Sequence, residues 1–181
     1  MTTPSADFVK NYAESDMTRL HMPGHKGQSF LGCESWDITE ISGADSLYEA
    51  EGIIAESEAN AAKLFGSKRT LFSTEGSSQC IRAMLYLAML NGQDRSKTKK
   101  RPVIAAARNV HKAFIYAATL LDFDVIWLWP KERVASICSC AIAPKQVEGV
   151  LDEHQEVIAV YLTSPDYLGA QADIRAIAEV C

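Results

Sequence analysis

Several features that would point to common functions are absent from this sequence of 181 residues. No stretch of 18 apolar residues occurs and no leader pattern opens the chain, so a membrane partner is not expected. The formal net charge of -5 leaves no basic excess to attract nucleic acid. The GxGxxG and GxxxxGK[ST] nucleotide fingerprints are also missing. Small molecules are therefore the partners to consider.

The cysteines have neither an even count nor the spacing of a disulfide framework. There are five of them: Cys33, Cys80, Cys138, Cys140 and Cys181. Such usage suits reduced thiols and predicts a cytoplasmic protein. A metal site could be drawn from His21, His25 and Cys33, but Pro23 and Gly24 keep the two histidines off a common helical face. No metal site is predicted.

The composition that is present, 48% hydrophobic and 23% charged, suits a globular chain with a sizeable core. Residues 1–50 have little periodicity beyond a short amphipathic piece at 8–12, and we interpret them as an amino-terminal arm. Residues 51–181 carry regular apolar patterns and form the predicted main domain.

Residues 70–90 (TLFSTEGSSQCIRAMLYLAML) are predicted to form a strand, a turn and a helix. Gly76 allows a tight exit from the strand, and Ser77 or Ser78 can cap the helix. The backbone N–H groups and positive dipole end of such a helix favour a phosphate group. The alternative is an ordinary capped helix that follows a strand.

Strands and helices alternate along the rest of the main domain. The predicted elements are a helix at 52–65, strands at 103–107, 125–128 and 157–163, and helices at 110–121, 145–151 and from 174 onward. This order predicts an α/β fold with a mostly parallel sheet and helices on both faces. Ligands of such sheets bind at the carboxyl ends of the strands. Residues 76–78, 108–111 and 163–165 all lie at predicted strand ends, which favours the phosphate interpretation.

Six short segments carry a family resemblance. They are residues 21–26 (HMPGHK), 37–45 (DITEISGAD), 61–66 (AAKLFG), 75–78 (EGSS), 108–112 (RNVHK) and 163–169 (TSPDYLG). In this order they resemble the amino-terminal part of the major domain of the Orn/Lys/Arg decarboxylases, which are fold-type-I enzymes that use pyridoxal 5'-phosphate (PLP). The resemblance implies an incomplete fold-type-I large domain.

The resemblance also implies roles for individual residues. Gly76, Ser77 and Ser78 correspond to the turn that binds the cofactor phosphate, and His111 to the catalytic histidine that stacks on the pyridine ring. Lys112 does not match the Schiff-base lysine of the family. Two positions depart from the family pattern. Glu75 stands where the family often has a neutral polar residue, and its carboxylate would repel the phosphate if it were directed at it; Ala113 replaces a frequent serine.

The implied reaction is decarboxylation of lysine, ornithine or arginine to an amine and carbon dioxide, in a homodimer or higher homo-oligomer. The family's DEAHG-like and SxHK-like segments, which carry the pyridinium aspartate and the Schiff-base lysine, do not occur in residues 1–181. The chain is therefore expected to be a fragment that is inactive alone. Two alternatives are a degenerate PLP- or phosphate-binding module and another fold-type-I enzyme, such as an aminotransferase.

Overall fold

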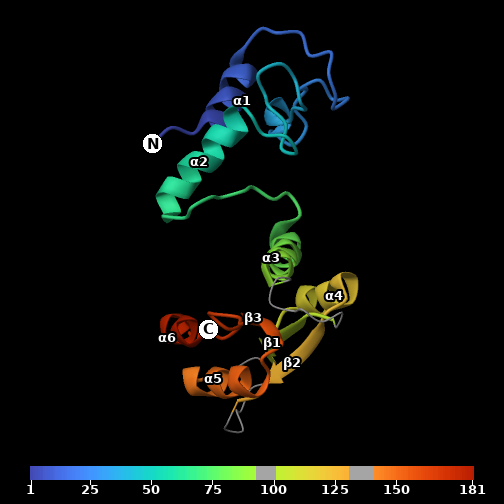
Figure 1. Ribbon diagram of the computed structural model, residues 1–181. Helices are drawn as coiled ribbons and strands as arrows, with labels where there is room; N and C mark the ends of the chain where they lie inside the picture. Colours follow the sequence, from blue (N-terminus) through green and yellow to red (C-terminus); the bar gives the residue numbers. More distant parts are fainter. Residues whose placement is uncertain (93–100, 131–140) are drawn as a thin grey trace. The chain divides into compact units, whose positions relative to one another are not determined.

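The computed structural model describes residues 1–92, 101–130 and 141–181, and they form two compact units. The amino-terminal unit comprises Met1–Phe72 and the carboxyl-terminal unit Ser73–Cys181. Each unit is described by itself (Figure 1). The domain boundary that we place between residues 50 and 51 stays a prediction, because a compact unit need not coincide with a domain.

The carboxyl-terminal unit is built on a parallel sheet of three strands in the order β2-β1-β3. They are β1 (Val103–Ala107), β2 (Asp124–Leu128) and β3 (Val157–Tyr161). Ala106 in the central strand pairs with Trp127 on one side and Tyr161 on the other. Because all three strands run the same way, their carboxyl ends meet at one edge. The predicted parallel α/β sheet is confirmed.

Helices cover both faces of this sheet, as predicted (Figure 1). The helices are α3 (Gly76–Gly92), α4 (Lys112–Leu121), α5 (Pro144–Glu153) and α6 (Ile174–Val180). Alternate residues of a strand face opposite sides, so Ile104 and Ala106 pack beneath α3 and α4, whereas Ala105 and Ala107 pack toward α5 and α6. Both clusters are apolar, which makes burial of hydrocarbon the main source of stability here.

Phe114 is the largest fully buried side chain among the described residues. It is 0% exposed, and its ring centroid lies 4.7 Å from that of Tyr161 and 5.6 Å from that of Phe123. The Trp127 ring of β2 meets it edge-on at 6.1 Å. Tilted and edge-to-face contacts of this kind add to the stability that area burial provides. Phe114 therefore ties α4 to β2 and β3.

The strand predicted at residues 70–72 does not form. Leu71 and Phe72 are 61% and 44% exposed, and the Phe72 N–H donates to the Glu58 carboxylate (2.8 Å) instead of a neighbouring strand. An apolar run becomes a strand only when another strand pairs with it, and that partner is not encoded in the run itself. The last strand also ends earlier than predicted, at Tyr161 and not at Thr163.

The amino-terminal unit has more regular structure than the sequence predicts. It contains α1 (Pro4–Glu14), a 3-10 turn at Glu34–Trp36 and α2 (Ile53–Phe65), which ends at Gly66 with φ 63°. Two bonds of Ser5 link the helices: its N–H donates to the Ser57 hydroxyl (3.1 Å) and its hydroxyl to the Ile53 carbonyl (3.2 Å). The amphipathic piece predicted at 8–12 is thus part of a longer helix, α1.

Two carboxylates organise the loops of this unit. Asp45 accepts the N–H groups of Ser46, Glu51, Gly52 and Ile54 at 2.8 to 3.2 Å. Partial burial opposes ionisation, but the four donors outweigh it and lower the pKa of Asp45 to about 2.

Glu34 plays a similar part in the preceding loop. Its carboxylate accepts the N–H groups of Leu31 (2.6 Å) and Gly32 (2.9 Å). Backbone hydrogen bonds, chiefly that of Leu31, lower the pKa of Glu34 to about 2. Hydrogen bonds to two charged groups thus provide much of the order that an apolar core provides in the other unit.

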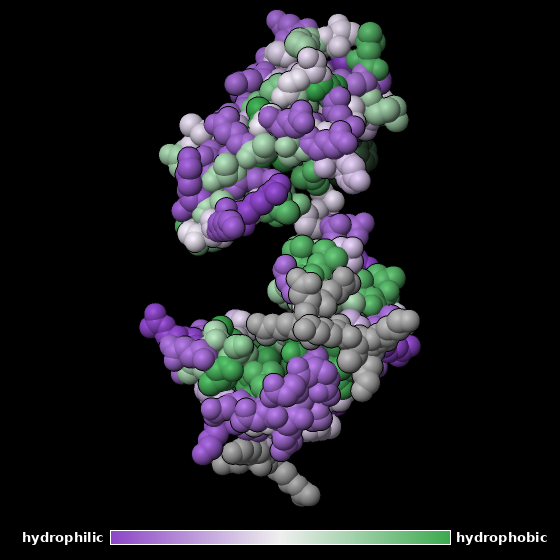
Figure 2. Space-filling model, viewed as in Figure 1, coloured by the Kyte–Doolittle hydropathy of each residue, from purple (hydrophilic) through white to green (hydrophobic). Residues whose placement is uncertain are grey.

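Part of the apolar surface is open to solvent. Met84, Leu87 and Leu90 of α3 are 51%, 56% and 46% exposed, and Figure 2 shows hydrophobic side chains on the outer surface of that helix. Across the described ranges, however, every helix is too short or too polar to cross a membrane.

Candidate active site

The predicted phosphate turn lies at the beginning of α3. Gly76 has φ +65°, a left-handed conformation that glycine adopts without strain, and no heavy atom lies within 4 Å of the place where a Cβ would stand. The helix starts at Gly76, so Ser77 and Ser78 belong to its first turn and are not the caps that we predict. The first N–H groups of an α-helix have no partner within the helix, which leaves them available to an anion.

Both serine hydroxyls are available as well. Ser77 is exposed and Ser78 half-buried, and neither side chain makes a hydrogen bond to another described residue. A hydroxyl can donate to a phosphate oxygen in addition to the backbone N–H groups. The turn therefore has the donors and the open space that a phosphate group needs.

His111 begins the second helix of the candidate site. It is the N-cap of α4, and its Nδ1 accepts the Ala113 N–H at 3.2 Å. A neutral imidazole that accepts at Nδ1 carries its proton on Nε2. The ring is thus held by its own helix, and it lies at an exposed position from which it can contact a ligand. The backbone N–H of Ala113 makes this bond, so the cap does not depend on the side chain at position 113.

The beginnings of α3 and α4 adjoin. Ser78 and Lys112, the residue after His111, line the same cavity of about 60 Å³ together with Arg82, Ala113 and Tyr116. Ligand pockets usually have volumes of several hundred Å³, so this cavity marks where the helices meet and does not enclose a cofactor. The structure brings Ser78 next to the RNVHK segment, although Gly76, Ser77 and His111 do not line this cavity.

Arg82 is a candidate site residue that our sequence analysis missed. Its Nη2 lies 3.5 Å from the Glu75 carboxylate, so the carboxylate that could repel a phosphate is paired with a cation. Arg82 also follows Ser78 by four residues, a spacing that places two side chains on one helical face. That spacing was the signal that could have identified it.

Two further polar groups follow β1 at the carboxyl edge of the sheet. The Arg108 guanidinium lies over the rings of Trp127 (5.1 Å) and Trp129 (4.9 Å), and the two indoles fix its position. The Asn109 Oδ1 is buried and has no hydrogen-bond partner in the described parts of the chain. A buried acceptor without a donor is costly, which favours a missing donor at this edge. The unpaired Asn109 oxygen and the open turn at Gly76 together suit a ligand that carries a phosphate and other polar groups.

Only part of the third predicted strand end, residues 163–165, remains available to a ligand. The Ser164 hydroxyl already accepts the Ala172 N–H at 3.0 Å. β3 lies beside β1, so Thr163 follows the same edge as Arg108. Since no strand forms at residues 70–72, the phosphate turn reaches this region through α3 and not as a strand end.

The HMPGHK segment belongs to the amino-terminal unit, where both histidines are locked by hydrogen bonds. His21 Nε2 lies 2.7 Å from the Tyr12 hydroxyl and its Nδ1 bonds to the Met22 carbonyl. His25 Nδ1 accepts the Gly27 N–H (3.0 Å) and its Nε2 lies 3.2 Å from Asp37. All four ring nitrogens are occupied, so neither imidazole has a lone pair for a metal ion.

Comparisons with known proteins bear on this site. Residues 3–181 match the family described as Orn/Lys/Arg decarboxylase, major domain. The chain is 29% identical over 189 residues to an arginine decarboxylase of Halalkalibacterium halodurans, covering 99% of this chain and 37% of that protein. It is 28% identical over 188 residues to an arginine decarboxylase of Bacillus subtilis, covering 98% and 36%. The chain thus spans little more than a third of the length of these relatives.

Proposed function

Because the chain belongs to the Orn/Lys/Arg decarboxylase family, we propose that it supplies the phosphate-binding part of a PLP-dependent active site that decarboxylates a basic amino acid. Its parallel sheet with helices on both faces is consistent with part of a fold-type-I large domain. The observation that carries the proposal is the meeting of Ser78 and Lys112 at the adjoining starts of α3 and α4. Both of those relatives are named arginine decarboxylases, which favours arginine over lysine and ornithine.

The chain's own residues would bind and orient the cofactor. The N–H groups of residues 76–78 and the hydroxyls of Ser77 and Ser78 would hold the phosphate, with Arg82 adding positive charge. His111 would stack on the pyridine ring, and its bond to the Ala113 N–H would help to hold the imidazole in position. When bound, PLP supplies the electron sink for the bond that is broken.

Other parts of the reaction need residues that positions 1–181 do not contain. Neither a DEAHG-like nor an SxHK-like segment occurs there, and Lys112 lines the cavity between the helices. We therefore expect residues 1–181 alone not to release carbon dioxide from arginine. We also propose a cytoplasmic homodimer or higher oligomer, with no nucleic-acid or membrane partner. The acidic composition supports the absence of a nucleic-acid partner, and the odd cysteine count supports the cytoplasmic location. The oligomer is what the family resemblance implies.

Binding of pyridoxine 5'-phosphate, which lacks the aldehyde and cannot form a Schiff base, tests the phosphate site. Replacing Ser77 and Ser78 by alanine should weaken binding by about 1 to 3 kcal/mol, the cost of lost charge-assisted hydrogen bonds. The matched control replaces Ser29 and Ser42, two exposed serines of the amino-terminal unit, and should leave the affinity unchanged. Equal affinities of the wild type and the Ser77/Ser78 variant would remove the site.

A chimera tests the chemistry. Residues 3–181 would replace the matched part of the Bacillus subtilis arginine decarboxylase, with carbon dioxide release from arginine as the readout. We expect activity that falls when His111 is replaced by alanine and is partly retained with phenylalanine, which keeps a flat ring. A folded chimera that binds PLP without decarboxylation would favour the binding module, and transamination would favour an aminotransferase.

A further inference from the structure

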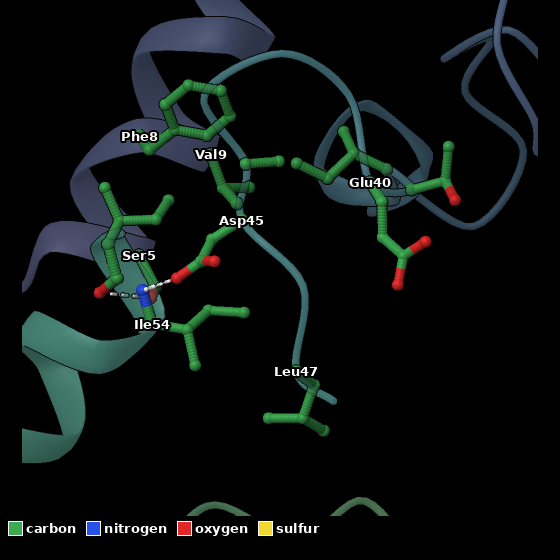
Figure 3. A pocket seen from close by; sticks show the side chains of 11 residues that line it. Ser5, Phe8, Val9, Glu40, Asp45, Leu47 and Ile54 are labelled. Atoms are coloured by element: carbon green, nitrogen blue, oxygen red, sulfur yellow. Dashed lines mark hydrogen bonds between the residues drawn. The ribbon is translucent and has the colours of Figure 1, made fainter. Parts of the chain in front are cut away.

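The amino-terminal unit contains a cavity of about 520 Å³ that the proposed reaction does not use. It lies between α1, the loop at 38–47 and the start of α2 (Figure 3). Its volume is within the range of small-molecule sites. All of its lining residues belong to this one unit, so the cavity is a property of the unit itself.

The charge in this cavity has one sign. Glu40 and Asp45 are its charged lining residues, and no lysine, arginine or histidine contributes to its wall. Figure 3 shows the Asp45 carboxylate directed at the start of α2, where it accepts the Ile54 N–H. The N–H groups of Ser46, Glu51 and Gly52 complete the four donors that favour its ionised form. Asp45 is therefore a fixed negative charge whose hydrogen-bonding capacity is already used.

Glu40 is the acid that remains available to a ligand. One of its oxygens, Oε1, accepts the Ser46 hydroxyl at 2.9 Å, and its side chain is otherwise exposed. The second oxygen makes no hydrogen bond to a described residue. A donor that carries positive charge would satisfy this oxygen and would also be attracted by Asp45.

The rest of the wall is largely hydrocarbon. Phe8 and Val9 from α1, Leu47 from the loop and Ile54 from α2 face the cavity, and Figure 3 shows Glu40 apart from the residues of the two helices. Apolar walls stabilise methylene groups, whereas a carboxylate placed against them would lose its hydration without gaining a cation as its partner. The cavity thus suits a ligand with an aliphatic chain and a cationic end.

We propose that this cavity binds an aliphatic amine, with its ammonium group on Glu40 and its methylene chain against the apolar wall. The choice of amine rests on the proposed function, because decarboxylation turns a basic amino acid into an amine that has lost its carboxylate. The amino acid itself would bring that carboxylate into a cavity that already contains two negative charges. The site therefore discriminates product from substrate by electrostatic repulsion.

Calorimetric titration of the full chain with 1,5-diaminopentane tests the proposal, with lysine as the comparison because it differs by one carboxylate. Glu40→Gln preserves the shape and the bond to Ser46 but removes the charge, and it should weaken diamine binding about tenfold or more. Glu49→Gln, at an exposed acid of the same unit that does not line the cavity, is the matched control and should bind as the wild type does.

Three outcomes would overturn the site: no diamine binding by the wild type, equal losses in the two variants, or lysine binding as tight as that of the diamine. A far-ultraviolet circular dichroism spectrum of each variant checks that it is folded. These results are separate from the fate of the proposed function, since pyridoxine 5'-phosphate binding at Ser77 and Ser78 does not depend on Glu40. If diamine binding is absent while pyridoxine 5'-phosphate still binds, only the amine site is wrong; the reverse result would reject only the phosphate site.

Discussion

The two units of this chain are ordered by different forces. In the amino-terminal unit the buried apolar residues are Tyr12 and Ala44, while Glu34 and Glu58 are buried acids that accept backbone N–H groups. In the carboxyl-terminal unit, apolar clusters fill both faces of the sheet. Hydrogen bonds to carboxylates can order loops without a large core, whereas burial of hydrocarbon needs helices and strands packed in layers. The two units should therefore lose their structure under different perturbations.

The largest expected effect is in the apolar core of the carboxyl-terminal unit. Phe114→Ala should lower the free energy of unfolding by about 3 to 5 kcal/mol, because a large buried ring is replaced by a cavity. Urea denaturation monitored by tryptophan fluorescence, in a Trp36→Phe background, follows this unit through Trp127 and Trp129. Phe30→Ala, which alters a ring that is 91% exposed in the other unit, is the control and should cost less than about 0.5 kcal/mol. Equal costs would contradict the comparison.

A smaller effect is expected where one carboxylate orders the amino-terminal unit. Asp45→Asn keeps the size of the side chain but places an NH₂ group against some of the four N–H donors. Hydrogen exchange at Gly52 and Ile54 should become faster, with no change in the amides of β1. Asp16→Asn, an exposed substitution in the same unit, should leave both sets of amides as they are. Faster exchange throughout both units would show that they are not independently ordered.

The smallest effect separates the units by pH. Asp45 and Glu34 have ordinary pKa values of 3.8 and 4.5 that folding lowers to about 2, so the unfolded chain takes up protons first on acidification. Their contribution is complete above the ordinary values and is lost as the pH falls toward about 2. Trp36 fluorescence during an acid titration should report this loss.

The carboxyl-terminal unit should respond at the opposite end of the scale. Burial raises the pKa of Tyr161 above its ordinary value of 10.0, and an interaction with Thr163 opposes part of the rise. The unfolded phenol then ionises before the folded one, so stability falls as the pH rises past about 10. Tyr161→Phe should remove this alkaline sensitivity. If one unit lost its structure at both acid and alkaline pH while the other stayed folded, the expected difference between the units would be wrong.

Much of the carboxyl-terminal unit could be predicted because its signals are local. The strand at 103–107 matches β1, and the helix predicted at 110–121 differs from α4 only at its start. Periodicity identifies such elements because each buries one face. The strand prediction at 70–72 was wrong because its success depended on a non-local signal. An apolar run of that length needs a pairing strand that lies elsewhere in the chain.

The candidate site was predicted less completely. The phosphate turn at Gly76, Ser77 and Ser78 was predicted from the pattern of a helix start as well as from the family resemblance, whereas the role of His111 came from the resemblance. Both assignments stay predictions. Arg82 could have been identified by its spacing from Ser78, but its pairing with Glu75 and the aromatic support of Arg108 depend on three-dimensional contacts. The role of Asp45 was also hidden, because it binds amides up to nine residues away and so lies outside the usual capping positions.

The central strand has a consequence for how this chain can vary. Ala105, Ala106 and Ala107 are at most 1% exposed and lie between helical layers on both sides. A valine there would bring extra methyl groups into a filled space, and a glycine would loosen the strand. The tolerance for mutation should thus be narrowest where the side chains are smallest. A saturation library selected for folding should retain little besides alanine and serine at these three positions.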